Sequence, residues 1–315
     1  MYNVIESREE SRRSYERRPT GVVLMMVREP IVAGRFYEAG AERCRAAVVD
    51  LLSRAGEAFT TEKTIYGGLV PHAGWVCSGV VAARVFQAIR RQGLPRTIVL
   101  FGGVHRYRGR EAALFGGGRW ETPLGPVEID SRLAERILGH TSLIIEDAYA
   151  HEDEHSLEVQ VPFIKYLFPE TRIVPIMVPS LATADEVGEA VGRTLKAYNS
   201  EAVVVGTTDL THYGPNYGFI PEGVGAKGNR WAKEVNDRRF IDLVCRMQCE
   251  TLVAEAVEKK NACSSGAAAA TLATARTLGA ACGVLLEHTT SSEVLTGLSN
   301  ETMTDSVGYA GIVFV

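Results

Sequence analysis

Residues 97–105 read TIVLFGGVH, an apolar run that ends in two glycines and a histidine. An uninterrupted apolar run of this length, bounded by glycine, is typical of a strand buried on both faces of a parallel sheet. Two other segments repeat the pattern: residues 65–71 form a short apolar run that continues into HAG, and residues 202–205 (AVVV) continue into GTTDLTH. These three segments predict the centre of the fold.

Segments with helical spacing of apolar residues separate these runs. Helices are expected at residues 42–55, 78–91, 131–138, 156–168, 183–197, 229–245, 250–258 and 264–278, and further strands at 172–178, 283–287 and 307–315. Glycine and proline in residues 116–130 predict a β-hairpin in this segment. Strands that alternate with helices imply βαβ units. The predicted fold class is therefore α/β, a single domain with a central, mainly parallel sheet flanked by helices.

The domain organisation follows from where the pattern starts. The 315 residues would suit about two domains of roughly 150 residues each. No linker interrupts the pattern after residue 27, so residues 27–315 are expected to form one domain. Within residues 1–26, the run SREESRRSYERRPTG (residues 7–21) is dense in Arg and Glu, with almost nothing apolar from its start to Val22. Residues 1–26 are therefore predicted to form a disordered charged tail. This tail lacks the apolar segment of a signal peptide.

Composition excludes several classes of protein. Lys and Arg number 34 against 38 Asp and Glu, a net charge of −4, so the chain carries no electrostatic footprint for nucleic acid. No stretch approaches the roughly 20 apolar residues that span a membrane. Six cysteines with no CxxC pair are too few for a disulfide scaffold. A reduced, cytoplasmic α/β protein is the expectation.

Polar residues follow each of the three apolar runs. His72 follows the first run, His105 the second, and Asp209 with His212 the third. In an open parallel sheet, ligands bind beyond the carboxyl ends of the strands. One such histidine is more often structural than a ligand, but three at equivalent positions predict a shared cleft.

Two further segments carry reactive side chains. In residues 151–163 (HEDEHSLEVQVPF), His155 and Glu158 share one helical face, without the HExxH spacing of zinc proteases. Cys263 precedes a run of small residues that predicts a helix, so its thiol is expected at a helix N-terminus, where a thiolate is favoured. Spacing alone favours a buried small apolar role for Cys263 over a nucleophile or a soft metal ligand.

Six motifs occur in the order REPIVAGRFY, VPHAGWVCSG, GGVHRYRG, EDEHSLEVQVPF, TTDLTHYG and NACSS. In this order the chain resembles the Memo-like proteins, also called the AmmeMemoRadiSam system protein B family, from Glu29 to the C-terminus. That family is similar in fold to the LigB-type class III extradiol dioxygenases. The resemblance implies an α/β core with a metal site in a cleft.

The resemblance also implies roles for individual residues. The metal ligands would be His72, His105 and Cys263, a donor set that suits Fe²⁺ first and copper as an alternative. His212, oriented by Asp209, and His155 would act as acid and base groups beside the substrate.

The chain departs from the family pattern at two places. Ser264 and Ser265 follow the cysteine where many relatives have Gly-Arg, which removes a cation from the cleft and withdraws support for a shared substrate. Arg106 follows His105 where some relatives have a second histidine. Arg106 either replaces the lost charge or is a solvated loop residue.

Three functions are compatible with these residues. The first is a metal-dependent oxidoreductase, dioxygenase-like, that acts on a small-molecule substrate. The alternative is a non-catalytic binding module for a phosphate- or carboxylate-bearing ligand or peptide, for which the motif loops offer Arg106, Arg108 and Arg110. The third is a hydrolase with Cys263 as nucleophile. The family resemblance further implies radical-SAM and AMMECR1-like proteins as partners.

Overall fold

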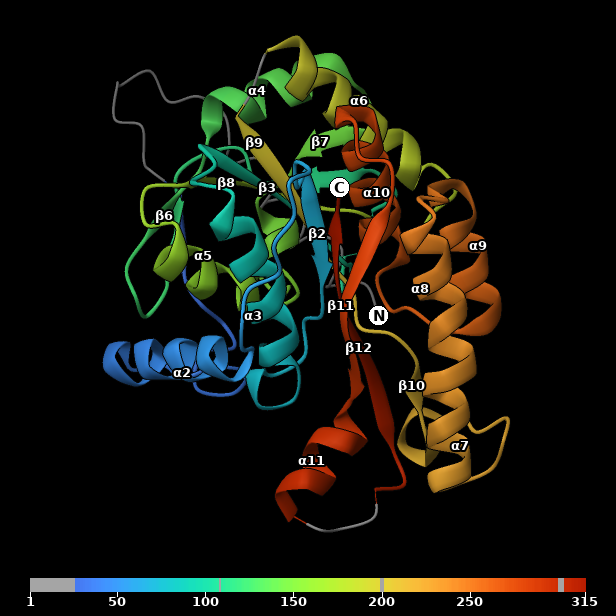
Figure 1. Cartoon of the computed structure of the whole chain (residues 1–315). Helices are drawn as coiled ribbons and strands as arrows, with labels where there is room; N and C mark the ends of the chain where they lie inside the picture. Colours follow the sequence, from blue (N-terminus) through green and yellow to red (C-terminus); the bar gives the residue numbers. More distant parts are fainter. Residues whose placement is uncertain (1–25, 108, 199–200, 300–302) are drawn as a thin grey trace, which may run out of the picture.

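The computed structural model describes residues 26–107, 109–198, 201–299 and 303–315 (Figure 1). All but the last residue of the tail predicted for residues 1–26 lies outside these ranges. The fold is a mixed α/β domain built on one large sheet with helices on both faces. No helix in these ranges is both long enough and apolar enough to cross a membrane.

Four parallel strands form the middle of the sheet. They lie in the order β2 (Gly67–Val70), β9 (Ala202–Thr207), β3 (Thr97–Gly102) and β8 (Arg172–Met177). Each pairs in parallel with its neighbour. These are the apolar runs of the sequence, so the predicted parallel core is confirmed, and the carboxyl ends of β2, β9 and β3 meet at one edge.

Antiparallel pairs extend this core on both sides. Beyond β2 lie β12 (Ser306–Phe314), β11 (Gly283–Thr290) and the short β10 (His212–Tyr213), all antiparallel to their partners. Beyond β8 lie β4 (Ala112–Leu114), antiparallel to β8, and β7 (Ile144–Glu146), parallel to β4. The sheet is therefore parallel at its centre and mixed at its margins.

A second, small sheet is separate from the large one. Its strands are β1 (Val27–Arg28), β5 (Arg119–Trp120) and β6 (Val127–Glu128). β5 and β6 pair antiparallel and form the hairpin that glycine and proline predicted in residues 116–130.

The two faces of the large sheet carry separate helical layers. One layer contains α2 (Ala41–Arg54), α3 (Trp75–Arg91) and α5 (Val161–Leu167). The other contains α4 (Ser131–His140), α6 (Ala184–Ala197), α8 (Arg238–Cys245), α9 (Cys249–Lys259) and α10 (Ser265–Leu278). Alternate residues of β3 serve the two layers: Ile98 and Leu100 pack on the first, Val99 and Phe101 on the second.

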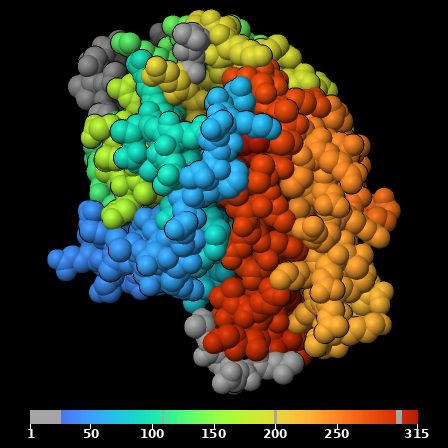
Figure 2. Space-filling model, viewed as in Figure 1, coloured from blue at the N-terminus to red at the C-terminus, as the bar shows by residue number. Residues whose placement is uncertain are grey.

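The C-terminal part of the chain runs between two flanks. In Figure 2 the red C-terminal segment separates the blue and cyan N-terminal elements from the orange α8 and α9. The strands β11 and β12 extend below the helical layers, where α7 (Ala226–Trp231) and α11 (Ser291–Ser299) lie (Figure 1).

Two predicted helices differ from the observed ones. The helix expected at residues 156–168 begins as a 3₁₀ turn, Glu158–Gln160, and becomes α-helical only at Val161. Pro162 explains this, because proline has no N–H to donate and is tolerated only in the first turn of an α-helix. The helix expected at residues 229–245 consists of α7, a π-helical turn (Ala232–Asp237) and α8.

Small residues bring α10 close to the sheet. Ala267, Ala268, Ala269 and Ala270 are fully buried. A Cβ on Gly206 of β9 would lie 2.0 Å from the hydroxyl oxygen of Thr271, so only glycine allows this approach. The close packing places the start of α10, with Cys263 just before it, at the carboxyl ends of the central strands.

Candidate metal centre

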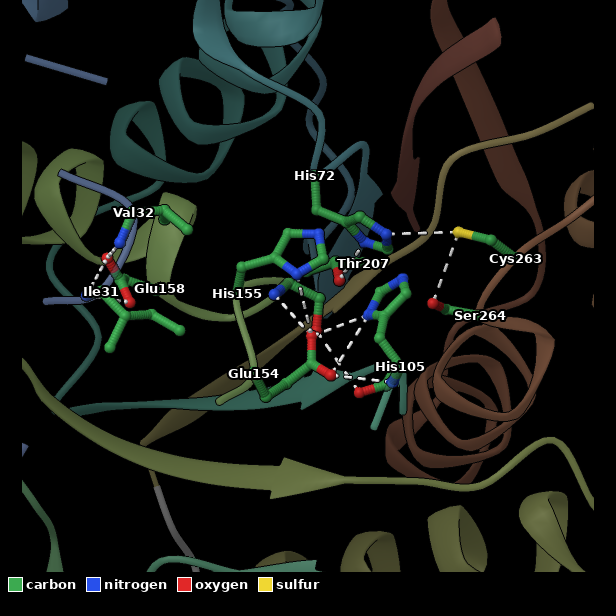
Figure 3. Close-up of polar contacts among 12 residues, drawn as sticks. Ile31, Val32, His72, His105, Glu154, His155, Glu158, Thr207, Cys263 and Ser264 are labelled. Atoms are coloured by element: carbon green, nitrogen blue, oxygen red, sulfur yellow. Dashed lines mark hydrogen bonds and ion pairs between the residues drawn. The ribbon is translucent and has the colours of Figure 1, made fainter. Parts of the chain in front are cut away.

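His72, His105 and Cys263 meet at the carboxyl ends of β2 and β3 and the start of α10 (Figure 3). One nitrogen of each imidazole and the sulfur all lie within 4.8 Å of one another. Nε2 of His72 is 3.2 Å from Sγ of Cys263. The structure thus brings together the two histidines that the strand ends predicted in one cleft and the cysteine that the family resemblance added to them.

His72 is held in one orientation from two sides. Its ring is 2% exposed, and Nδ1 is hydrogen-bonded to the hydroxyl of Thr207, at the end of β9, at 2.8 Å. Its backbone N–H donates to Oδ1 of Asp209 at 2.8 Å. Because Nδ1 is engaged, Nε2 is the nitrogen that faces Cys263.

His105 is fixed by Glu154, a residue to which the sequence assigned no role. Nδ1 of His105 lies 2.9 Å from Oε1 of Glu154, and the backbone N–H of His105 donates to Oε2 at 2.9 Å. The N–H of Ser156 holds the same carboxylate at 2.8 Å. Burial raises the pKa of Glu154, but the hydrogen bond and charge of His105 lower it well below the ordinary range. A carboxylate behind a histidine is the usual support of a metal-ligating imidazole.

The backbone around Cys263 is tied to the loop after β9. The N–H of Cys263 donates to the carbonyl of Asp209 at 3.1 Å, and the N–H of Ser264 donates to the hydroxyl of Thr208 at 3.1 Å. A Cβ on Gly103 would lie 1.8 Å from the Ser264 hydroxyl oxygen. The second glycine of TIVLFGGVH therefore makes room for the segment that carries the thiol.

The three side chains shift one another's ionisation. Burial raises the pKa of Cys263, but the charge of His72 and hydrogen bonds from His105 and His72 lower it to about 5. Burial lowers the pKa of His105, but hydrogen bonds to Cys263 and Glu154 raise it to about 10. The pKa of His72 is raised by Cys263 and Asp209 against the effect of burial. The cluster therefore holds a thiolate at neutral pH.

His155 lies against His72 and His105. Its ring centroid is 4.4 Å from that of His105 and 5.7 Å from that of His72. Burial, together with the charges of these two rings, lowers the pKa of His155 to about 4. His155 is therefore neutral at pH 7 and able to accept a proton.

Asp209 contacts a different partner from the one expected. The carboxylate of Asp209 accepts hydrogen bonds from the backbone N–H groups of His72 and Ala73. In the part of the chain that the structure describes, no hydrogen bond joins it to His212. The interpretation that Asp209 orients His212 is corrected: Asp209 shapes the loop that carries His72. His212 lies on β10, and its ring is 5.0 Å from that of Tyr217.

A buried ion pair supports the loop that carries Glu154. The guanidinium of Arg28, 5% exposed, donates to Glu158 at 2.9 Å, to the carbonyl of Glu154 at 2.6 Å and to that of His151 at 3.0 Å. The other oxygen of Glu158 accepts from the hydroxyl of Tyr37 at 2.9 Å. Sequence spacing had singled out Glu158 but not this partner, which lies 130 residues away.

Arg106 does not place a charge in the cleft. Its side chain is 75% exposed and lies 4.0 Å from the carboxylate of Asp153, which is also exposed. Arg110 is exposed as well, and Arg108 lies outside the described residues. Of the two roles considered for Arg106, replacing the lost charge or lying in a solvated loop, the structure supports the second.

Comparisons with known proteins identify the same family that the six ordered motifs suggested. The family model of the Memo-like protein matches residues 28–313. A MEMO1 family protein of Thermococcus onnurineus is 36% identical over 297 residues, covering 92% of this chain and 99% of that protein. One of Pyrococcus abyssi is 38% identical over 300 residues, covering 91% and 99%.

Among solved structures, an uncharacterized protein of Escherichia coli K12 aligns with a TM-score of 0.47 and 10% identity, over 80% of this chain and 100% of that one. The similarity in fold to extradiol dioxygenases stays a prediction.

The family profile and the two relatives from Thermococcus and Pyrococcus span nearly the whole domain. The chain therefore belongs to the family of Memo-like proteins.

Proposed function

We propose that this protein is a metal-dependent oxidoreductase that binds Fe²⁺ and acts on a small molecule in the cleft beyond the central strands. One observation carries the proposal: two imidazoles and a thiolate from three distant segments place their donor atoms within 4.8 Å of one another. Copper is the alternative metal, because the same donor set suits it.

The donor geometry supports a bound transition metal. With metal–nitrogen and metal–sulfur bonds of about 2.1 and 2.3 Å, two ligand atoms at the tetrahedral angle lie roughly 3.6 Å apart. The distance between His72 Nε2 and Cys263 Sγ is 3.2 Å, close to that value. Thr207 and Glu154 hold the opposite ring nitrogens, as expected for histidines whose other nitrogen binds a metal.

The remaining residues would manage protons and substrate. Fe²⁺ at this site would supply redox chemistry and open positions for oxygen and substrate. His155 is neutral at pH 7 and would take a proton from the substrate at an imidazole nitrogen. His212 borders the cleft on the side of Cys263 and would act as a second proton carrier.

Metal analysis tests the proposal directly. After anaerobic purification and reconstitution with Fe²⁺, we expect about one iron per chain. A chain that retains neither iron nor copper under these conditions would contradict the oxidoreductase and favour the non-catalytic binding module.

Replacing His212 by alanine is expected to leave bound iron unchanged and to lower turnover by roughly 10²–10⁴-fold, because the residue would move protons without binding the metal. Oxygen uptake would be measured with a substrate from a screen of catechols and aminophenols. Loss of iron from this variant would instead make His212 a ligand.

Replacing Glu154 by glutamine is expected to weaken iron binding by roughly 10–100-fold, because the neutral amide supports the His105 ring less well than the carboxylate does. Competition with a chelator of known affinity measures the change. Glu152→Gln is the matched control, since Glu152 is exposed. Equal affinity of the two variants would remove Glu154 from the metal site.

A cysteine hydrolase is the second candidate function. The 3.2 Å contact between Cys263 and His72, with the thiol pKa lowered to about 5, favours it because a nucleophilic cysteine needs these features. Such a hydrolase would work without metal and lose its activity on alkylation of the thiol. Cytoplasmic location stays a prediction from composition, and association with radical-SAM and AMMECR1-like proteins stays a prediction from the resemblance.

A further inference from the structure

A pocket of about 430 Å³ adjoins the metal centre on the side of Cys263. Its lining includes Ala256 and Val257 of α9 and residues of the segments that follow β9 and β10. Leu210, Phe219 and Val257 contribute apolar surface, and His212 borders it as well. A volume of this size suits a small molecule, because small-molecule sites measure roughly 300–1,000 Å³.

The pocket carries one lysine ammonium beside the Cys263 thiolate. Lys260 lines it, and no acidic side chain is found among the described residues that do. Nζ of Lys260 lies 5.5 Å from the centre of the Phe219 ring. None of the ion pairs among the described residues includes Lys260, whereas the neighbouring Lys259 pairs with Glu258. The pocket therefore offers an ammonium that has no carboxylate of the protein to neutralise it.

The backbone at Lys260 is unusual for a lysine. This residue ends α9 in the left-handed conformation, with φ 53° and ψ 43°. Helices that end in this way most often use glycine, because a Cβ is disfavoured there. Residues kept in such conformations cluster at functional sites. Lysine here thus keeps a backbone conformation that glycine would adopt at lower cost, as does Met247, the other described non-glycine residue with positive φ.

The geometry points to a small aromatic monocarboxylate as the occupant of this pocket, with its carboxylate on Nζ of Lys260 and its ring against Phe219. The inference rests on the proposed function in one respect only: it takes the occupant of the pocket to be the substrate of the proposed oxidoreductase. Phosphate is less suited, because its recognition commonly uses the two-pronged hydrogen bonds of arginine, and no arginine is among the described lining residues. The rings of Phe219, Tyr217 and His212 offer aromatic faces.

Binding of 2-naphthoate tests the inference without a need for turnover. Titration calorimetry would measure its affinity for the iron-loaded and the metal-free protein. Lys260→Met removes the charge and retains most of the length, and we expect it to weaken binding by roughly tenfold or more, as for loss of a hydrogen bond to a charged group. Lys260→Arg is expected to restore most of the affinity. Lys259→Met is the matched control and should bind as the wild type does.

Two further probes separate charge from shape. We expect 2-naphthamide, a neutral analogue, to bind weakly and equally to the wild type and Lys260→Met. Lys260→Gly should lose affinity for 2-naphthoate while its melting temperature stays at or above that of the wild type, because glycine suits the left-handed backbone. This variant excludes unfolding as the cause of the lost binding.

The possible outcomes each decide the matter. No binding of 2-naphthoate, equal binding of the amide, or unchanged affinity in Lys260→Met would overturn the inference. Tighter binding of 2-naphthyl phosphate than of 2-naphthoate would replace the carboxylate by a phosphate and also overturn it. Charge-dependent binding to a protein that retains no iron would uphold the pocket and contradict the proposed function alone.

Discussion

Replacing His72 by alanine, or Cys263 by serine, is expected to reduce bound iron from about one ion per chain to almost none. Each change removes one of the three donor atoms of the His72–His105–Cys263 cluster, which lie within 4.8 Å of one another. A serine hydroxyl does not ionise near neutral pH, so it cannot take the place of a thiolate. Elemental analysis after anaerobic reconstitution measures the loss.

The matched control for Cys263→Ser is Cys77→Ser. Cys77 is another partly buried free cysteine, and it lies near the start of α3, outside the three-residue cluster. Iron should stay near one per chain in this variant. Full retention of iron in both His72→Ala and Cys263→Ser would show that the protein binds iron at another site.

Replacing Glu158 by alanine is expected to lower the free energy of unfolding by about 3–5 kcal/mol, the usual cost of leaving a buried charge without its partner. Arg28, 5% exposed, would lose the 2.9 Å ion pair. The backbone N–H groups of Ile31 and Val32 would lose their acceptor as well. Urea denaturation followed by circular dichroism measures the change.

Glu38→Ala is the control for Glu158→Ala. Glu38 pairs with Arg43 at the surface, where both side chains are exposed, and such pairs contribute roughly 0–1 kcal/mol. A double variant, Arg28→Met with Glu158→Leu, should cost less than Glu158→Ala alone, because no charge is then left unpaired. A single variant as stable as the control would contradict the role given to this ion pair.

The central strands and most helices could be predicted because their apolar residues follow a regular period. His72 and His105 could be placed in one cleft because strand ends meet at one edge of a parallel sheet. Cys263 could be added to them only through the resemblance to the Memo-like family, because spacing alone favoured a buried apolar role for it. The short strands β4, β7 and β10 span two or three residues each. They could not be predicted, because so few residues cannot show a periodic pattern of apolar side chains.

The supporting residues of the site could not be predicted for a different reason. Glu154 stands in a run of acidic residues that equally suits the N-terminus of a helix, and only its contacts with His105 set it apart. Asp209 holds the backbone of His72, 137 residues away in sequence. Lys260 is distinguished by its positive φ, which the sequence alone does not reveal. Such relations depend on tertiary contacts that no local pattern records.

The packing of α10 against β9 has a consequence for the energetics of the whole domain. Cys263 and His72 are 191 residues apart in sequence, and that packing is what brings them together. An unfolded chain therefore has no preformed site, and any ion bound there adds its binding free energy to the stability of the folded state. At a free-ion concentration of 100 times the dissociation constant, this contribution is about 2.7 kcal/mol. Binding of the proposed metal would therefore link metal supply to thermal stability.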